Sequence, residues 1–456
     1  MIKRTLAEIA AMVDGSINER FKDILVSGVT NDTRKIESGN LFVPLQGEHS
    51  NGHDHVGTAF KEGAAASFWE KDAKNPPEDR PLIVVEDSLR ALQQLSKAYL
   101  QELNAKVIGI TGSNGKTTTK DMTASIMKTK YRVHKTSGNY NNHIGLPLTI
   151  LSAPEDTEML ILEMGMSSRG EISLLSNIGQ PDAAIITNIG ESHLLDLGSR
   201  EGIADAKMEI AEGLKKNGTL IYNGDEPLLL SRVAKHNYKK ITFGSSMTND
   251  YYPIQSIAGE NEMRFKVDVE GIHSFVLPLL GNHNVLNALA AIAAGKTMGL
   301  SWEQIAEGLA EVKLTNMRME VSVGERGEKI INDAYNASPT SVKAAIELVK
   351  GMTGTGKKIL VLGDMLELGP EEEVYHSKMG ELITKEIDYV FTYGKLAEKI
   401  AESAERNLGN KHVFHFNDKN QLSLKLKEVI DQHSIVLVKA SRGMKLEEVV
   451  RNLQGK

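Results

Sequence analysis

The chain contains no cysteine among its 456 residues, which excludes disulfide bonds and metal sites built on thiolates. Aromatic residues make up only 5% of it, and no basic run is interleaved with aromatics, so a net charge of −7 argues against a nucleic-acid partner. No apolar run reaches the length of a transmembrane segment, and Glu8 and Asp14 interrupt the start of the chain where a signal peptide needs a continuous apolar stretch. We therefore expect a cytoplasmic protein.

The chain is too long for one ordinary core, and its 41% hydrophobic and 25% charged residues are typical of globular proteins. Apolar runs such as LILEMG, AAIITNIG and GTLIYNGDE end in polar or glycine-rich turns and alternate with helical patterns. Such runs predict parallel strands buried on both faces, hence an α/β fold. We expect three domains: a small α/β domain over 1–85, a central parallel-sheet domain over 86–315 and a C-terminal Rossmann-like domain over 316–456.

The segment VIGITGSNGKTTTK at 107–120 has the order of a phosphate-binding loop: a short apolar strand, a glycine turn, Lys-Thr, then a helix. Backbone N–H groups of such a turn cradle phosphate oxygens, and the helix N-terminus adds positive potential. Lys116 can reach the phosphates and Thr117 can hold Mg²⁺. The general pattern has a glycine where this chain has Ile110, so a plain helix-starting turn with a solvated lysine remains an alternative.

In a parallel sheet, ligands bind beyond the carboxyl ends of the strands, so the residues there are candidates for a site. Glu163 ends one strand and suits Mg²⁺, although a capping or surface carboxylate is equally compatible with the sequence. His193 follows another strand and, taken alone, is an ordinary loop histidine. Lys207 lies in a helical segment, where a solvated lysine is the default. Beyond the last strand lie three polar residues, which a solvated basic turn would also explain: Lys439, Ser441 and Arg442.

In the first domain, Asp32, Thr33 and Arg34 form a compact polar cluster in a turn-rich segment. An arginine fork can donate two parallel hydrogen bonds to a phosphate. A surface turn with a local Asp–Arg pair is the reading that the residues alone favour.

Several segments, taken together and in this order, resemble the Mur ligases, which build the peptide of the bacterial cell-wall precursor. They are TGSNGKTTTK, GNYNNHIGLPLTIL, LEMG, TNIGESHLLDLGS, AKMEI and GNHNVLNALAA, and the resemblance covers nearly the whole chain. DAYNASPTS and LGDMLELG narrow it to the members that attach D-alanyl-D-alanine. Members that add the third residue, and the related folylpolyglutamate synthases, usually carry an Asp-x-Ala-His-type segment in place of DAYNASP.

The resemblance implies a reaction. ATP phosphorylates the terminal carboxylate of UDP-N-acetylmuramoyl-tripeptide, the amine of D-alanyl-D-alanine attacks the acyl phosphate, and an amide, ADP and phosphate result. It also implies Mg²⁺, with a second ion bridging the γ-phosphate and the substrate carboxylate. Lys207 matches the lysine that some members carry as a carbamate, which is a hypothesis for this chain. The sequence shows no apolar interface, so we expect a monomer.

The resemblance also implies roles for individual residues. Catalysis is implied for Lys116, His193 and Lys207, and metal binding for Thr117, Glu163 and His193. ATP contacts are implied for Gly112, Ser113, Asn114, Gly115, Lys116, Thr117, Thr118, Asn284, Asn287, Arg318 and Asp333. The UDP substrate is implied to contact Thr30, Asp32, Thr33, Arg34, Gly47, His53, Asn139 and Asn142, and the dipeptide to contact Asn336, Ser338, Lys439, Ser441 and Arg442. One departure is Ala440, where the family often has glycine.

Two alternatives remain. The chain could be a ligase of the same family that adds the third residue, or a folylpolyglutamate synthase. It could instead be a binding protein that uses ATP to switch conformation, which would leave Glu163, His193 and the cluster Lys439–Arg442 without a purpose. For a ligase with three domains around one site, we predict that ATP and the UDP substrate draw the third domain onto the central one.

Overall fold

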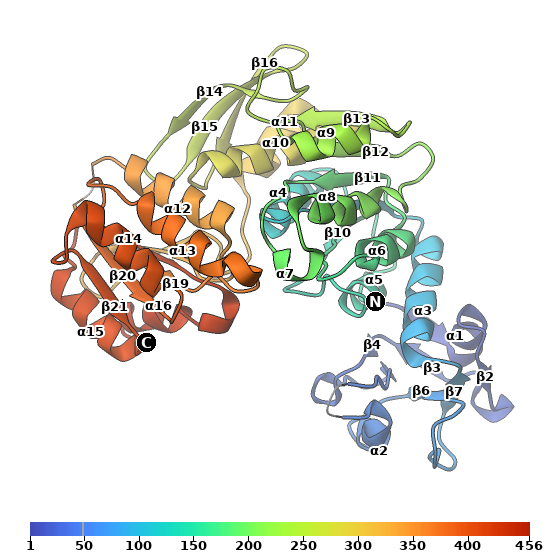
Figure 1. Cartoon of the computed structure of the whole chain (residues 1–456). Helices are drawn as coiled ribbons and strands as arrows, with labels where there is room; N and C mark the ends of the chain where they lie inside the picture. Colours follow the sequence, from blue (N-terminus) through green and yellow to red (C-terminus); the bar gives the residue numbers. More distant parts are fainter. Residues whose placement is uncertain (48–49, 355) are drawn as a thin grey trace.

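The computed structural model describes residues 1–47, 50–354 and 356–456, and it has the α/β fold that the sequence predicts. Figure 1 shows three sheet-containing units, with the central unit between the N-terminal unit (blue) and the C-terminal unit (orange to red). No helix of the described residues is long and apolar enough to cross a membrane.

The N-terminal unit holds a mixed five-stranded sheet of order β2-β7-β6-β5-β4 and a short antiparallel pair, β1 with β3. Its strands are β1 (Lys3–Thr5), β2 (Ser16–Ile17), β3 (Leu25–Ser27), β4 (Val29–Thr30), β5 (Leu41–Phe42), β6 (Ala66–Glu70) and β7 (Leu82–Val85). Its helices are α1 (Leu6–Met12), which begins with a capping box formed by Thr5 and Glu8, and α2 (Val56–Lys61).

The central unit is built on a parallel six-stranded sheet of order β13-β12-β11-β8-β10-β9. The strands are β8 (Lys106–Thr111), β9 (Val133–Lys135), β10 (Met159–Glu163), β11 (Ala183–Ile186), β12 (Thr219–Asn223) and β13 (Lys239–Phe243). The helices are α4 (Lys116–Lys128), α5 (Gly145–Leu151), α6 (Glu171–Gly179), α7 (Leu194–Leu197), α8 (Arg200–Met208), α9 (Pro227–Val233), α10 (Asn282–Thr297) and α11 (Trp302–Ala310).

A three-stranded antiparallel sheet adds to the central unit: β14 (Pro253–Ala258), β15 (Met263–Asp268) and β16 (Ile272–Leu277). This sheet is not among the expected elements, although β15 alternates strictly between buried and exposed residues, as a half-buried strand does. The buried side of this sheet packs into the same core as α4, α10 and α11. Lys329 of the third unit bonds Asn261, in the turn between β14 and β15 (Nζ to Oδ1, 2.6 Å), so the sheet also contacts that unit.

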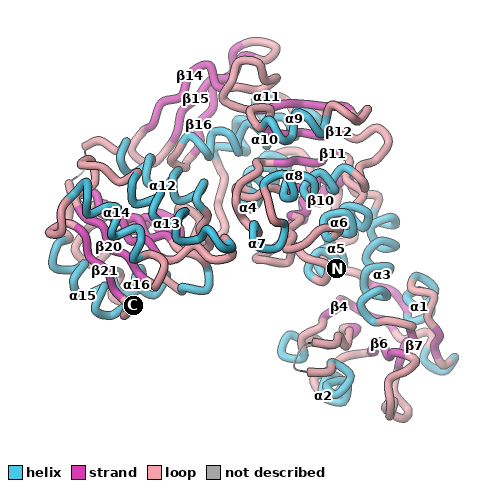
Figure 2. Tube along the Cα trace, in the orientation of Figure 1, coloured by secondary structure: helices cyan, strands magenta, loops and turns pink. Residues whose placement is uncertain are grey.

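The C-terminal unit has a six-stranded sheet of order β17-β18-β22-β19-β20-β21, parallel except for the edge strand β17. Figure 2 shows helices on both sides of these strands. The strands are β17 (Glu320–Val323), β18 (Lys329–Asp333), β19 (Lys358–Gly363), β20 (Tyr389–Tyr393), β21 (Val413–Phe416) and β22 (Ile435–Lys439). The helices are α12 (Pro339–Gly351), α13 (Glu372–Glu381), α14 (Glu398–Leu408), α15 (Lys419–Val429) and α16 (Glu447–Leu453).

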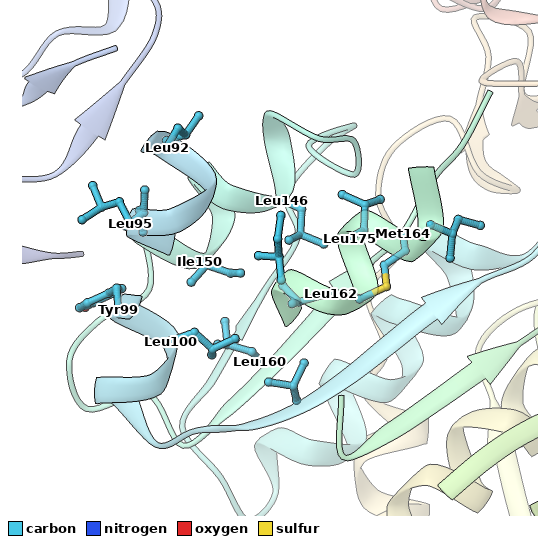
Figure 3. Packing of buried hydrophobic residues seen from close by; sticks show 14 of the residues in the cluster. Leu92, Leu95, Tyr99, Leu100, Leu146, Ile150, Leu160, Leu162, Met164 and Leu175 are labelled. Atoms are coloured by element: carbon cyan, nitrogen blue, oxygen red, sulfur yellow. The ribbon is translucent and has the colours of Figure 1, made fainter. Parts of the chain in front are cut away.

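Helix α3 (Ser88–Leu103) joins the first two units through a shared apolar core. Its buried residues recur at helical spacing, and they face α5 and β10 in Figure 3. The residues that Figure 3 labels around this contact are Leu92, Leu95, Tyr99 and Leu100 of α3, Leu146 and Ile150 of α5, and Leu160 and Leu162 of β10. The Tyr99 hydroxyl, at the end of this contact, donates to the Ala153 carbonyl at 2.9 Å.

Candidate active site

The predicted strand, glycine turn and helix are present as β8, residues 112–115 and α4. Gly112 (φ +148°) and Gly115 (φ +80°) adopt backbone conformations that side chains disfavour. A Cβ at Gly112 would lie 1.8 Å from Thr187 Oγ1, and one at Gly115 would lie 2.4 Å from Asn287 Oδ1. Only glycine fits these two positions, because Thr187, directly after β11, and Asn287 of α10 pack against the loop.

Lys116 is half-buried and bonded to its own loop, which disfavours the alternative of a freely solvated lysine. Its ammonium donates to the carbonyl of Gly112 at 2.7 Å and to that of Ser113 at 3.3 Å, across the mouth of the turn. Loss of hydration, assisted by repulsion from Arg318 and opposed by attraction to Glu163, lowers the pKa of Lys116 to about 8. The ammonium is thus held where the phosphates of a nucleotide would approach the loop.

A cavity of about 290 Å³ lies in front of the loop, between the central and C-terminal units. It brings together residues predicted from three distant parts of the sequence. They are the loop residues Ser113 to Thr118, Asn284 and Asn287 of α10, and Arg318, Asp333, Asn336 and Lys439 of the C-terminal unit. Its lining also includes residues that the sequence analysis did not single out: Thr187, Asn188, Asn223, His283 and Thr340.

Lys439 ends strand β22 and is fully buried, so the solvated basic turn is wrong for this residue. Its ammonium lies 2.5 Å from Asp333 Oδ2, on the neighbouring strand β18, and 2.9 Å from the Asn336 carbonyl. Ser441 and Arg442 do not line the cavity. The Ser441 hydroxyl is buried and accepts from the Leu366 N–H at 2.9 Å, whereas Arg442 points outward and pairs with Glu447.

Three side-chain contacts join the C-terminal unit to the central unit beside this cavity. Ser338, the N-cap of α12, donates to Asn114 Oδ1 of the loop at 3.0 Å. Glu191 accepts from the hydroxyl of Thr340 at 2.7 Å. The partners in each of these two contacts are far apart in the sequence, so neither contact could be predicted from it.

The third contact involves His193, whose Nδ1 lies 3.2 Å from Glu367 Oε2. Glu367 belongs to the segment LGDMLELG, so the structure places this segment against a predicted metal ligand. Loss of hydration, with repulsion from Lys116 and Lys207, lowers the pKa of His193 to about 4. The imidazole is therefore neutral near pH 7 and can offer a lone pair to a metal.

Glu163, the acidic residue among the predicted metal ligands, is buried at the end of β10. Its Oε1 accepts from Asn141 Nδ2 at 2.9 Å, whereas its Oε2 is buried without a hydrogen-bond partner among the described residues. An unpaired buried carboxylate oxygen beside a phosphate loop fits a hard cation such as Mg²⁺. The described residues contain no group of three or more His, Cys, Asp and Glu side chains able to hold a metal, so phosphate and water would supply most ligands.

Lys207 is buried in α8, which contradicts the solvated lysine expected by default from its helical segment. Loss of hydration, with repulsion from Lys116, lowers the pKa of Lys207 far below its ordinary value. No carboxylate among the described residues forms an ion pair with it. A neutral amine is the form that can react as a nucleophile.

A second cavity, of about 750 Å³, lies between the N-terminal and central units. It collects most residues predicted for the UDP substrate: Asp32, Thr33, Arg34, Gly47, Asn139 and Asn142. The local Asp–Arg pair is present as well, because Arg34 Nε and Nη2 donate to the two oxygens of Asp32 at 2.9 Å. These hydrogen bonds lower the pKa of Asp32 to about 2. The local pair and a position on the cavity wall are therefore compatible with each other, and a role in substrate binding stays a prediction.

Thr30 and His53 do not line this cavity. Thr30 borders a smaller neighbouring cavity that also contains Asp32. His53 instead packs within the N-terminal unit. Its ring lies edge-on to that of Trp69, with 4.8 Å between the ring centroids, and its Nε2 accepts from the Glu70 N–H at 3.3 Å. His55, two residues on, faces the larger cavity in its place, a difference that a sequence with both histidines in one short segment does not reveal.

The chain is similar to known proteins over nearly its whole length. Residues 110–295 match the Mur ligase middle domain, 317–442 the Mur ligase glutamate ligase domain and 25–100 the catalytic domain of the Mur ligase family. The UDP-N-acetylmuramoyl-tripeptide--D-alanyl-D-alanine ligase of Bacillus subtilis is 54% identical over 456 residues, 99% of each chain. A crystal structure of MurF from Acinetobacter baumannii has a TM-score of 0.90 at 28% identity over 100% of both chains. MurF ligase from Thermotoga maritima in complex with ADP has a TM-score of 0.85 at 30% identity, covering 94% of this chain and 97% of that one.

Proposed function

The chain belongs to the Mur ligase family, and from this premise we propose that it joins D-alanyl-D-alanine to UDP-N-acetylmuramoyl-tripeptide in peptidoglycan precursor synthesis. The observation that carries the proposal is the cavity in which the phosphate loop meets Arg318, Asp333 and Lys439 of the C-terminal unit. A phosphoryl group placed there has a lysine on one side and a second set of charged groups on the other. That is the arrangement a ligase needs to move the γ-phosphate of ATP onto a carboxylate.

The reaction is ATP-dependent and passes through an acyl phosphate. The tripeptide carboxylate attacks the γ-phosphorus and ADP leaves. The dipeptide amine then attacks the acyl carbon, and phosphate leaves as the amide forms. The loop N–H groups and Lys116 balance the negative charge of the phosphates, and the C-terminal unit excludes water from the acyl phosphate.

Thr117, Glu163 and His193 would hold Mg²⁺ here, and the unpaired Oε2 of Glu163 supports this assignment. When bound, Mg²⁺ supplies charge neutralisation on the phosphate oxygens. Asn284 and Asn287 are proposed contacts of the adenine of ATP, and Arg318 and Asp333 of its γ-phosphate and ribose. Asn336 and Ser338 are proposed contacts of the dipeptide. Lys207 is a candidate for carbamylation, because its low pKa leaves the amine free to react with CO₂.

The larger cavity beside Asp32 and Arg34 is the proposed site of the UDP substrate. Its lining comes from both the N-terminal and central units, so a bound UDP group would be held between them. We further propose that the N-terminal unit binds the UDP substrate, the central unit ATP and the C-terminal unit the dipeptide, and that the enzyme acts in the cytoplasm as a monomer.

The test is phosphate release from Mg·ATP in a matrix of acceptors. One arm contains UDP-N-acetylmuramoyl-tripeptide with D-alanyl-D-alanine, and the other contains the UDP-linked dipeptide with lysine or diaminopimelate. We expect release only in the first arm, with tripeptides that carry either lysine or diaminopimelate tried in parallel. Release only in the second arm would assign the chain to the preceding step. Release in neither arm, with ADP still bound, would favour the conformational switch.

A further inference from the structure

Helix α4 carries a second lysine, Lys120, one helical turn beyond Lys116. Lys120 is 0% exposed, and its Nζ has no hydrogen-bond partner among the described residues. It lies 3.6 Å from Asp121 Oδ1 and 3.7 Å from Glu163 Oε2. A buried ammonium without hydrogen bonds is costly, so its presence calls for a reason.

The two carboxylates beside Lys120 differ in how they are bonded. Asp121 Oδ1 accepts from Lys135 Nζ at 2.5 Å, and its Oδ2 accepts from the N–H and hydroxyl of Thr315 at 2.8 and 2.9 Å. Burial raises the pKa of Asp121, but Lys120, Lys135 and these hydrogen bonds outweigh it, so the pKa is lowered. Asp121 is thus fully bonded without Lys120.

Glu163 is only half bonded, because Asn141 holds Oε1 and nothing among the described residues donates to Oε2. The one ion pair that those residues offer Glu163 is the pair with Lys120. At 3.7 Å the ammonium is beyond hydrogen-bonding distance, so it balances the charge of the carboxylate without donating to its lone pairs. The lone pairs of Oε2 stay available to another electrophile.

We propose that Lys120 is a positioning residue for the magnesium–nucleotide complex. It supplies the counter-charge that holds Glu163 in place at a non-bonding distance, and Oε2 thereby stays available to Mg²⁺. The inference rests on the proposed function, which requires Mg·ATP. Without Lys120, Lys116 is the cation that still attracts Glu163. The carboxylate would then turn toward Lys116 and away from the metal.

The experiment measures ADP affinity by titration calorimetry, with saturating Mg²⁺ and with EDTA, in the wild type and in Lys120→Met. Methionine keeps the volume of the buried side chain and removes its charge. We expect the affinity in Mg²⁺ to fall about tenfold, the usual scale for residues that orient a metal ligand, while the affinity in EDTA is unchanged. Thr123→Val is the matched control, because Thr123 is a buried residue of α4 whose hydroxyl likewise has no hydrogen-bond partner within the described part of the chain. It should change neither affinity.

A parallel fall of both affinities in Lys120→Met would mean that Lys120 only stabilises α4, and no change in either would mean that it has no role; both overturn the inference. A wild-type ADP affinity that does not depend on Mg²⁺ would overturn this inference alone. Absence of phosphate release by the wild type in either arm of the acceptor matrix would instead overturn the proposed function, and this inference with it. The two failures are therefore distinguishable.

A double variant keeps the test valid if Lys120→Met does not fold. Lys120→Met with Glu163→Gln removes both charges, so the pair of substitutions leaves no unbalanced charge at Glu163. If Lys120 acts through Glu163, the double variant should bind ADP in Mg²⁺ as the single variant Glu163→Gln does. A further fall of threefold or more, beyond the ordinary non-additivity of about twofold, would show that Lys120 acts by another route and overturn the inference.

Discussion

The two cavities are built in different ways. The nucleotide cavity is the one lined by the phosphate loop and the C-terminal unit, and its charged groups are buried or half-buried and bonded within the fold. Lys439 is bonded to Asp333 and Asn336, and Lys116 to carbonyls of its own loop. The UDP cavity is the proposed substrate cavity between the N-terminal and central units. There, the Arg34 side chain is 87% exposed, and its partner Asp32 lies in the same turn. The first cavity is preorganised by the fold, whereas the exposed side chains of the second would become ordered when the proposed substrate binds. Preorganised charges are expected where phosphoryl transfer occurs, and adaptable ones where a large substrate is only gripped.

The largest effect expected from this difference is in the nucleotide cavity. Lys116→Ala should lower kcat/KM for phosphate release about a thousandfold, because it removes a fixed cation from the transferring phosphoryl group. KM for the UDP substrate should change little, since that cavity lies elsewhere. Steady-state phosphate release under saturation by each substrate in turn measures both. A fall confined to KM for the UDP substrate would contradict the assignment of the loop.

The next effect is on stability. Lys439→Met leaves Asp333 without its ion-pair partner in a site where Lys439 is 2% and Asp333 16% exposed, and should lower the free energy of unfolding by about 3 kcal/mol. Urea unfolding followed by circular dichroism measures it. The control is Lys427→Met, because Lys427 pairs with Glu325 at the surface and its loss should cost less than about 1 kcal/mol. Equal losses of unfolding free energy in both variants would contradict the expected difference between a buried and an exposed ion pair.

The two cavities should also differ in their response to pH. The pKa of Lys116 is about 8 before nucleotide binds, and phosphate favours the protonated form, so deprotonation opposes binding as pH rises. ADP affinity should therefore be constant below pH 7 and fall up to about tenfold between pH 8 and 9. Asp32, with a pKa of about 2, and Arg34 keep their charges throughout, so affinity for the UDP substrate should be flat. Calorimetry at each pH tests both, and parallel curves would contradict the prediction.

The smallest effect belongs to the UDP cavity. Arg34→Ala should raise KM for the UDP substrate three- to tenfold, on the order of one charge-assisted hydrogen bond, with kcat and thermal stability unchanged. Arg20→Ala is the matched control, because Arg20 is an exposed arginine of the same unit paired with Asp79 and does not line the cavity. An unchanged KM in Arg34→Ala would mean that Asp32, Thr33 and Arg34 form only a surface turn and do not bind the substrate.

Local patterns were enough to predict the loop and the helix that follows it, because turn glycines act within a few positions of the chain. They were not enough for Lys207 and Lys439, whose burial depends on elements far away in the sequence. The same is true of the contact between His193 and Glu367, which joins two units. The antiparallel sheet β14–β16 could have been predicted from the alternation in MRFKVD, a signal that the surrounding helix-and-strand pattern obscured.

Helix α3 sets a limit on how the chain can be shortened. Its apolar face is one wall of the core that α5 and β10 complete, as Figure 3 shows. A fragment that begins at Lys106 would therefore expose Leu146, Ile150 and Leu160 to water and should aggregate. One that begins at Asp87 retains both the N-cap of α3 and its apolar face. The smallest nucleotide-binding fragment for isotope labelling or fragment screening should therefore start before α3. In that fragment, the part of α3 that contacts α1 in the full chain would be exposed to solvent.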